Sequence, residues 1–529
     1  MPLTTSAANV AADNEEQLDS RLQQYKNLNK HDELRRRRTE CSVEIRKQKG
    51  ADMMMKRRNI VEAEEDSASE SESDVEHKPA SAPVRYTNDE IKKILSNNPT
   101  DEQMLKCFES LRKSLSKNKN PPIDEVIRTG LLHALVQALN LDNVKVLYEA
   151  AWALTNIVSG TTEQTIAAVE AGATAPLVKL SVHENPQLSE QALWAVANIA
   201  GDSAQLRDYV IQCHGIEALM HLMTSLDSLN VTHARTVAWA FSNMCRHKNP
   251  HAPINVLRVL SHGLTKLVQH SDPQVRQDAC WAVSYLTDGP DEQIELSREC
   301  GVLQHIIKFF DATETLVAPA LRTLGNVATG SDVLTQTVID LGTLEHIIPL
   351  LTRTKSTSIV KECCWLISNI IAGTQQQIQA VLDAHLLPVI VNILKSGDYK
   401  CQFEASWALS NLAQGGTSKQ IFEMVREGAI PAICEALNQT NTDMLNNALE
   451  TLYSILVTVS NSYPADVDSV NAQVEECGGL DQLERLQESQ SEQIYSHAYR
   501  IISEFFNVDD DAEVGNEIDE NSQNTPYAF

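Results

Sequence analysis

Several features that define common protein classes are missing from this sequence of 529 residues. It contains no apolar run of about 18 residues, the minimum for a membrane-spanning helix. Residues 1–20 lack the basic start and the apolar core of a signal peptide. We therefore expect a chain that is neither inserted in a membrane nor secreted.

Chemical motifs are missing as well. The eleven cysteines include no Cys-x-x-Cys pair and are scattered, which predicts free thiols in a reducing compartment and no zinc site. The motifs GxxxxGKS/T, HExxH and GxSxG are absent, and the histidines do not cluster with ligand spacing. We expect neither an enzyme nor a bound cofactor.

Aromatic and basic residues are both scarce. The 6 Trp, 11 Tyr and 9 Phe are too few for a typical β-sandwich or barrel and favour a helical interior. Lys and Arg number 44 against 71 Asp and Glu, and the basic residues are concentrated. Residues 21–60 hold 13 basic and 5 acidic side chains (+8), whereas residues 81–529 hold 30 and 54 (−24). A basic segment on an acidic body predicts attraction between the two, and to similar partners.

Composition divides the chain into five regions. Residues 1–20 are polar and expected to be disordered, and residues 21–60 are basic, with a helical pattern over Asp32–Lys49. Residues 61–86 form an acidic, Ser-rich linker that cannot bury enough apolar surface to fold. Residues 87–506 are densely apolar at helical spacing, and residues 507–529 are an acidic tail.

The long apolar region is repetitive. All six tryptophans occupy one local frame: AWALTNI (Trp152), LWAVANI (Trp194), AWAFSNM (Trp239), CWAVSYL (Trp281), CWLISNI (Trp365) and SWALSNL (Trp407). With Arg322 in the missing slot, successive spacings are 42, 45, 42, 41, 43 and 42 residues. Glycines keep the same period between apolar segments, at Gly130, Gly172, Gly215, Gly263, Gly301, Gly342, Gly428 and Gly478, with His385 in the one deviant slot. This period predicts an all-α, right-handed solenoid of about ten armadillo-type repeats.

The tryptophan frame carries a second residue at helical spacing. Five of the six tryptophans are followed by asparagine four positions later, which places both side chains on one helix face. The alternative is that tryptophan packs in the core, but asparagine would then be buried repeatedly without an evident partner. We favour a concave surface on which these residues bind an extended peptide, with adjacent repeats about three peptide residues apart.

The residue types indicate a basic peptide. Asparagine can both donate to and accept from a peptide backbone, while indole faces attract ammonium and guanidinium groups. Carboxylates flank the array at Asp202, Asp278, Glu362 and Glu404. Tyr285 replaces asparagine and Arg322 replaces tryptophan in the middle of the array. These replacements divide the groove into two sites, which suits a ligand with two basic clusters.

These motifs resemble the importin α (karyopherin α) family of nuclear-import adaptors. The likeness covers residues 21–505 and includes GTTEQT, SEQALW, CRHKNP and SYLTDGP around the frames, and the basic segment beginning RLQQYKNLNKHDELRRRR. It implies a major nuclear-localisation-signal site on Trp152, Asn156, Gln191, Trp194, Asn198, Asp202, Trp239, Asn243 and Asp278. It implies a minor site on Arg322, Asn326, Glu362, Trp365, Asn369, Glu404, Trp407 and Asn411.

The resemblance also implies partners. The basic segment, including Arg35, Arg36, Arg37, Arg38, Arg46 and Lys47, would bind importin β. Ran-GTP would release the cargo, and a dedicated receptor would export the adaptor, which would shuttle between cytoplasm and nucleus through the nuclear pore. Lys56, Arg57 and Arg58 have the residue types that the groove prefers, so we expect them to compete with cargo from within the chain.

Three other functions stay open on the residues alone. An armadillo scaffold of the adhesion or coactivator kind would bind acidic partners on a basic groove, which the −24 body disfavours. A nucleic-acid binder could use Arg35–Arg38, but the acidic body would repel phosphate. An enzyme is the third alternative, without a catalytic motif to support it.

Overall fold

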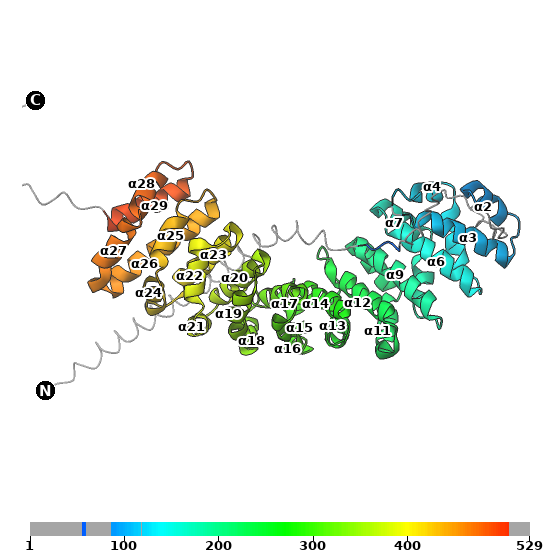
Figure 1. Cartoon of the computed structure of the whole chain (residues 1–529), viewed down its shortest axis with the longest axis horizontal. Helices are drawn as coiled ribbons and strands as arrows, with labels where there is room; N and C mark the ends of the chain where they lie inside the picture. Colours follow the sequence, from blue (N-terminus) through cyan, green and yellow to red (C-terminus); the bar gives the residue numbers. More distant parts are fainter. Residues whose placement is uncertain (1–55, 60–85, 118, 507–529) are drawn as a thin grey trace, which may run out of the picture. The chain divides into compact units, whose positions relative to one another are not determined.

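The computed structural model describes residues 56–59, 86–117 and 119–506, and throughout these ranges the regular structure is helical (Figure 1). The predicted helix Asp32–Lys49, the basic residues Arg35–Lys47, the linker up to residue 85 and the tail from residue 507 lie outside the described residues. The all-α prediction for the repeat region is confirmed.

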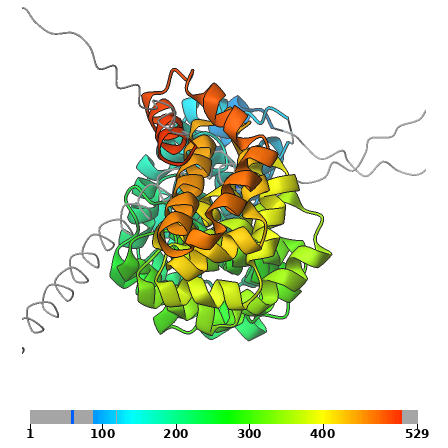
Figure 2. The same ribbon diagram turned by 90° about the vertical axis from the view of Figure 1, so that its left-hand side faces the viewer.

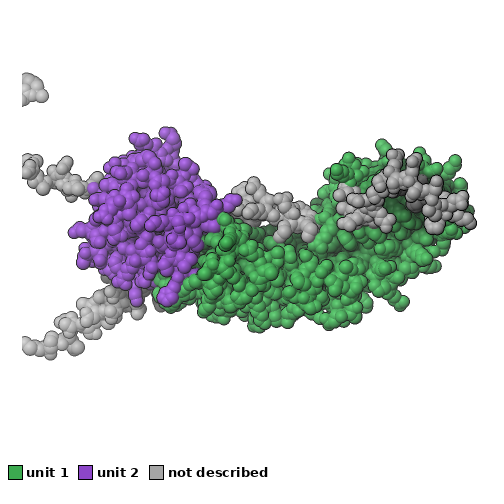
Figure 3. Space-filling model, in the orientation of Figure 1, with its two compact units in different colours: residues 1–384 green, residues 385–529 purple. Residues whose placement is uncertain are grey.

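The chain divides into two compact units, residues 1–384 and residues 385–529 (Figure 3). The described helices of unit 1 are α2 (Asn88–Leu95), α3 (Asp101–Leu115), α4 (Ile123–Arg128), α5 (Leu131–Ala138), α6 (Val144–Val158), α7 (Thr162–Glu170), α8 (Thr174–Leu180), α9 (Pro186–Asp202), α10 (Ala204–Gln212), α11 (Gly215–Thr224), η1 (Leu226–Ser228), α12 (Val231–Arg246), α13 (Ile254–Leu267), α14 (Pro273–Leu286), α15 (Asp291–Glu299), α16 (Leu303–Ile306), η2 (Ile307–Asp311), α17 (Glu314–Val327), α18 (Asp332–Asp340), α19 (Thr343–Arg353), α20 (Thr357–Ile371) and α21 (Gln375–Asp383). Those of unit 2 are α22 (Leu387–Ser396), α23 (Tyr399–Gly415), α24 (Ser418–Arg426), α25 (Ala429–Ala436), α26 (Thr442–Ser462), η3 (Pro464–Asp466), α27 (Val467–Glu476), α28 (Gly479–Leu486) and α29 (Glu492–Phe505), coloured yellow to red in Figure 2.

The helices that carry the tryptophan frame form the inner ladder of each unit. In unit 1, α3 packs on α6, α6 on α9, α9 on α12, α12 on α14, α14 on α17 and α17 on α20. In unit 2, α23 packs on α26 and α26 on α29. Each ladder therefore presents equivalent faces of successive repeats side by side.

Helix starts follow from local sequence. The segments GTTEQ, GTQQQ and GTSKQ each place threonine before a helix and glutamine three residues later. In the structure Thr161, Thr374 and Thr417 accept from the backbone of that glutamine, whose side chain accepts from the threonine N–H. This reciprocal cap satisfies two otherwise unpaired N–H groups and fixes the start of α7, α21 and α24.

The glycine period predicts turns, and most of them are confirmed. Six of the eight glycines have φ between 72° and 90°, a left-handed conformation that residues with a Cβ avoid. Gly215 does not, because His214 takes the left-handed position before it. The prediction for Gly263 is wrong: it lies inside α13, where a Cβ would stand 2.6 Å from the Phe241 ring. That glycine permits close helix packing rather than a turn.

No single helix among the described residues is long and apolar enough to cross a membrane, and only α21 and α22 taken together reach that length and composition.

His385 offers a test of the turn argument. It is exposed and holds the left-handed position with φ 55°, so His385→Gly should stabilise the protein by about 1 kcal/mol by removing the Cβ clash. Gly428→Ala is the matched control, because nothing would contact its added Cβ but its φ is 74°. Urea unfolding should shift to a higher midpoint for the first variant and to a lower one for the second. A lower midpoint for His385→Gly would contradict this account.

Candidate peptide-binding site

The four described residues 56–59 lie against the inner ladder of unit 1, where Figure 1 shows them as a short blue trace. Asn198 clamps the backbone of Arg57: its Oδ1 accepts from the Arg57 N–H at 2.8 Å, and its Nδ2 donates to the Arg57 carbonyl at 2.9 Å. The Trp194 indole N–H donates to the same carbonyl at 2.8 Å. One Trp–Asn pair therefore holds one residue of an extended segment by its backbone alone.

The next pair repeats this contact two residues further along the segment. Asn156 Oδ1 accepts from the Asn59 N–H at 3.0 Å, and the Trp152 indole donates to the Asn59 carbonyl at 3.2 Å. The segment runs antiparallel to the order of the repeats. The predicted step of about three residues per repeat is wrong. Two extended residues span about 7 Å, whereas packed helix axes lie about 8–10 Å apart. The contact points on the segment are therefore closer together than the axes of the helices that supply them.

The asparagines are buried, and their amide groups have partners within the ladder. Asn198 Nδ2 donates to the Thr155 carbonyl, Asn243 to Ala197, Asn326 to Ser284 and Asn369 to Gly325, at 2.8–3.3 Å. Each acceptor lies three residues after the tryptophan slot of the preceding repeat. The objection that buried asparagines would lack partners is therefore wrong. These bonds fix the side chains, and the Oδ1 atoms of Asn156 and Asn198 accept from the segment.

The Lys56 ammonium is held in a polar pocket at the end of α9. It pairs with Asp202 and donates to Thr165 Oγ1 at 2.7 Å and to the Gly160 carbonyl at 3.0 Å. Three acceptors converge on one point, which suits the compact charge of lysine. Sequence reasoning identified Asp202 but not Gly160 or Thr165, although both lie in the GTTEQT motif that supported the family resemblance.

Arg57 occupies the second cation site. Its guanidinium lies 4.6 Å from the Trp239 ring centroid and 3.2 Å from Asp278. Burial raises the pKa of the Asp278 carboxyl, and the positive charge of Arg57 opposes that rise. Stacking and ion pairing together define a slot for a cationic side chain.

The other two segment residues differ in how they are held. Arg58 makes only long contacts, 3.4 Å to Ser159 Oγ and 3.4 Å to the Lys117 carbonyl. The Asn59 side chain donates to Gln191 Oε1 at 2.9 Å. Asn59 was not among the residues predicted to compete with cargo, because its uncharged side chain gave no signal.

The predicted minor-site residues fall in both units and are described within each. In unit 1, Arg322 lies 2.8 Å from buried Glu362 and 6.0 Å from the Trp281 ring, and Trp365 is 3% exposed. A Cβ on Gly325 would overlap the Trp365 ring, so glycine makes room for it. In unit 2, α23 carries Glu404, Trp407 and buried Asn411.

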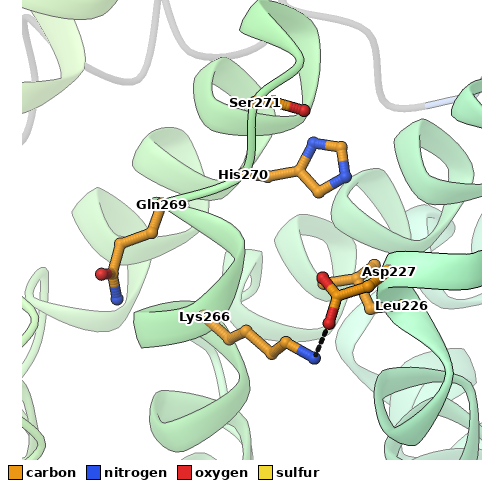
Figure 4. A pocket seen from close by; sticks show the side chains of 6 residues that line it. All are labelled: Leu226, Asp227, Lys266, Gln269, His270 and Ser271. Atoms are coloured by element: carbon orange, nitrogen blue, oxygen red, sulfur yellow. Dashed lines mark hydrogen bonds and ion pairs between the residues drawn. The ribbon is translucent and has the colours of Figure 1, made fainter.

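One period after Trp407, the segment LETLYSI has Glu450 in place of tryptophan and Ser454 in place of asparagine, and both side chains are bonded within the protein. Ser454, in the asparagine slot, donates to the Ala413 carbonyl at 2.6 Å, and Glu450, in the tryptophan slot, accepts from Gln414 at 2.7 Å. A separate pocket of about 430 Å³, lined by Leu226, Asp227, Lys266, Gln269, His270 and Ser271, includes none of the predicted site residues (Figure 4). No cluster of three or more His, Cys, Asp or Glu side chains within the described ranges could hold a metal ion.

Comparison with known proteins agrees with this geometry. The family model described as the importin beta binding domain matches residues 21–108, and the armadillo/beta-catenin-like repeat matches residues 119–159, 161–201, 203–246, 331–372 and 374–414. The model described as an atypical Arm repeat matches residues 469–520. The crystal structure of an engineered protein superposes with a TM-score of 0.70 at 26% identity, covering 79% of this chain and 98% of that one. The fold and groove are those of an armadillo-repeat protein.

Two relatives identify the family. Importin subunit alpha-2 of Caenorhabditis elegans is 69% identical over 533 residues, covering all of both chains. Importin subunit alpha-1a of Oryza sativa subsp. japonica is 35% identical over 507 residues, covering 94% of each chain. The chain belongs to the importin α family of nuclear-import adaptors.

Asp278 predicts how binding depends on pH. We define the emptied variant as the full chain with Lys56→Ala, Arg57→Ala and Arg58→Ala, and peptide 52–62 as a synthetic ligand of that sequence. Burial raises the pKa of the Asp278 carboxyl above its ordinary value, and a bound arginine opposes that rise. Affinity should therefore fall as pH falls through that raised pKa.

The measurement is calorimetry of peptide 52–62 with the emptied variant between about pH 7.5 and pH 5. Asp278→Asn in the emptied variant should bind more weakly at pH 7.5 and show a shallower fall toward pH 5. An equal pH slope in both proteins would contradict the role assigned to Asp278.

Proposed function

We propose that the groove on α6, α9, α12 and α14 is the major binding site for Lys/Arg-rich nuclear localisation signals. The observation that carries this proposal is the backbone clamp on Arg57 and Asn59 by the Trp194–Asn198 and Trp152–Asn156 pairs. A clamp on backbone atoms accepts many sequences, while the Lys56 and Arg57 pockets select positive charge.

In the minor site, Arg322, Asn326, Glu362, Trp365, Asn369, Glu404, Trp407 and Asn411 are proposed to bind the second cluster of a two-cluster signal. The Arg322–Glu362 ion pair supports a break between the two sites, because Arg322 puts a cation where a ligand cation would otherwise stack. The importin beta binding domain matched at residues 21–108 supports importin β as the carrier. Release by Ran-GTP, export by a dedicated receptor and passage through the nuclear pore belong to the same proposal.

Residues 56–58 are proposed to be an internal competitor that importin β removes. The match to the importin beta binding domain includes them, so capture of this region by importin β would withdraw them from the groove. Residues 59–86, about 30 residues, separate them from the first helix and give a reach of roughly 30 Å, with an effective concentration on the order of millimolar. Cargo binding and importin β binding must then favour each other by the same factor.

Trp194 tests the assignment of the major site. It is the central tryptophan of the three and donates to the ligand backbone, so Trp194→Ala in the emptied variant should cost on the order of 2 kcal/mol in binding a single-cluster peptide. Trp407→Ala is the matched control and should leave that affinity nearly unchanged. Calorimetry that found equal losses in the two variants would remove the distinction between major and minor sites.

The internal competitor is tested by removing it. The emptied variant should bind a single-cluster signal peptide about tenfold more tightly than the unmodified chain, because a tethered competitor is gone. Arg35→Ala, Arg36→Ala and Arg37→Ala in one chain removes the same charge outside residues 56–58 and should not change the affinity. Fluorescence anisotropy without importin β would make the comparison, and equal affinities of all three proteins would rule out autoinhibition.

A further inference from the structure

Arg112 makes a contact inside the protein that repeats the one between the groove and Arg57. Its guanidinium lies 4.4 Å from the Trp152 ring centroid and 2.7 Å from Glu149, and Tyr148 packs edge-on against the same indole at 5.6 Å. The Arg112 and Glu149 side chains are 10% and 13% exposed. Arg57 likewise meets an indole face and a carboxylate, although Trp239 and Asp278 come from the successive helices α12 and α14, whereas Trp152 and Glu149 both lie on α6.

Glu149 has the sequence position of Asp278, which pairs with Arg57, and of Glu362, which pairs with Arg322. It lies three residues before Trp152, as Asp278, Glu362 and Glu404 lie three residues before Trp281, Trp365 and Trp407. Trp152 and Glu149 thus have the components of a further slot for a basic side chain. Arg112, from the preceding helix α3, fills that slot from within the chain.

The register of the bound segment shows which ligand residue would reach this slot. The backbone of Arg57 is held by α9 and its side chain reaches Trp239 on α12, while Asn59 is held by α6 and reaches Gln191 on α9. Each side chain extends one repeat beyond the helix that holds its backbone. Successive repeats hold the segment backbone two residues apart. A ligand residue two positions after the one that takes the place of Asn59 would therefore extend its side chain to α6, where the Arg112 side chain already lies.

We propose that Arg112 is a specificity-determining residue that ends the run of basic residues the groove accepts, by occupying a latent cation slot formed by Trp152 and Glu149. It also positions Trp152, whose indole N–H holds the ligand backbone. A basic ligand side chain at that position gains nothing in the native protein, because the indole face and the carboxylate are already taken. This inference rests on the proposed peptide-binding function.

The experiment compares two peptides on the full chain. Peptide 52–62 has valine at the position two after Asn59, and its partner carries Val61→Arg. The emptied variant should bind both peptides within about threefold of each other. With Arg112→Ala added, the Val61→Arg peptide should bind about tenfold more tightly than peptide 52–62, the gain expected from one stacked and paired cation.

Two further variants separate this role from a purely structural one. Adding Glu149→Gln to Arg112→Ala removes the carboxylate of the slot and should abolish most of the gain. Arg112→Lys keeps a cation in place and should keep the native lack of preference. If Arg112→Ala does not fold, judged by circular dichroism, Arg112→Gln replaces it, because its shorter, uncharged side chain removes the cation from the Trp152 ring and from Glu149 but leaves a smaller void than alanine.

The outcomes are distinct. A Kd ratio between the two peptides that stays the same in the Arg112→Ala or Arg112→Gln variant as in the emptied variant would overturn the proposal, even if both affinities fall. Failure of the emptied variant to bind either peptide would instead overturn the proposed function of the groove.

Discussion

The hydrogen bond that Asn198, Asn243, Asn326 and Asn369 each donate to the preceding repeat is the interaction on which the groove depends. It joins Nδ2 of the asparagine to a carbonyl three residues after the preceding tryptophan slot, as between Asn198 and Thr155. One amide group therefore ties neighbouring inner helices together and fixes its own rotamer. The asparagine oxygen is left directed at the ligand, as Asn156 and Asn198 show. In Asn198, one side chain both joins neighbouring repeats and holds the backbone of Arg57, so the spacing of the repeats sets the spacing of the backbone contacts to residues 56–59.

Charge selection is added to this backbone clamp in a small number of places. Lys56 lies where carbonyl, hydroxyl and carboxylate oxygens converge at Gly160, Thr165 and Asp202, and Arg57 lies where an indole face is near Asp278. Equivalent indole and carboxylate groups elsewhere in unit 1 are filled by the protein's own arginines, Arg112 and Arg322. On the proposed function, these internal cations would limit how long a run of basic ligand residues the groove accepts.

The sequence predicts the architecture of this protein more completely than it predicts the contacts within the groove. The period of the tryptophan frames predicts the repeats, and the Trp–Asn spacing predicts the shared helix face, because both are properties of a single helix. The step of two ligand residues per repeat and the role of Gly160 depend on how neighbouring helices approach, which no local pattern contains. Gly263 fits the glycine period yet lies within α13, since close packing against Phe241 also requires glycine. Asn59 shows the same limit, because its backbone bonds to Asn156 and Trp152 and its side-chain bond to Gln191 depend on tertiary contacts.

The contact distances of residues 56–59 in the groove are consistent with a segment that a ligand can displace. Lys56 and Arg57 fill well-formed pockets, but Arg58 makes two contacts of 3.4 Å, at the long limit of hydrogen bonding. A tethered segment needs little intrinsic affinity, because its effective concentration is already on the order of millimolar. A tighter segment would hold the groove closed against cargo as well as against weak ligands. On the proposed autoinhibition, a cargo with a better-matched side chain at the position of Arg58 would displace the tethered segment. Removal of the segment by importin β would lower the affinity that such a cargo needs.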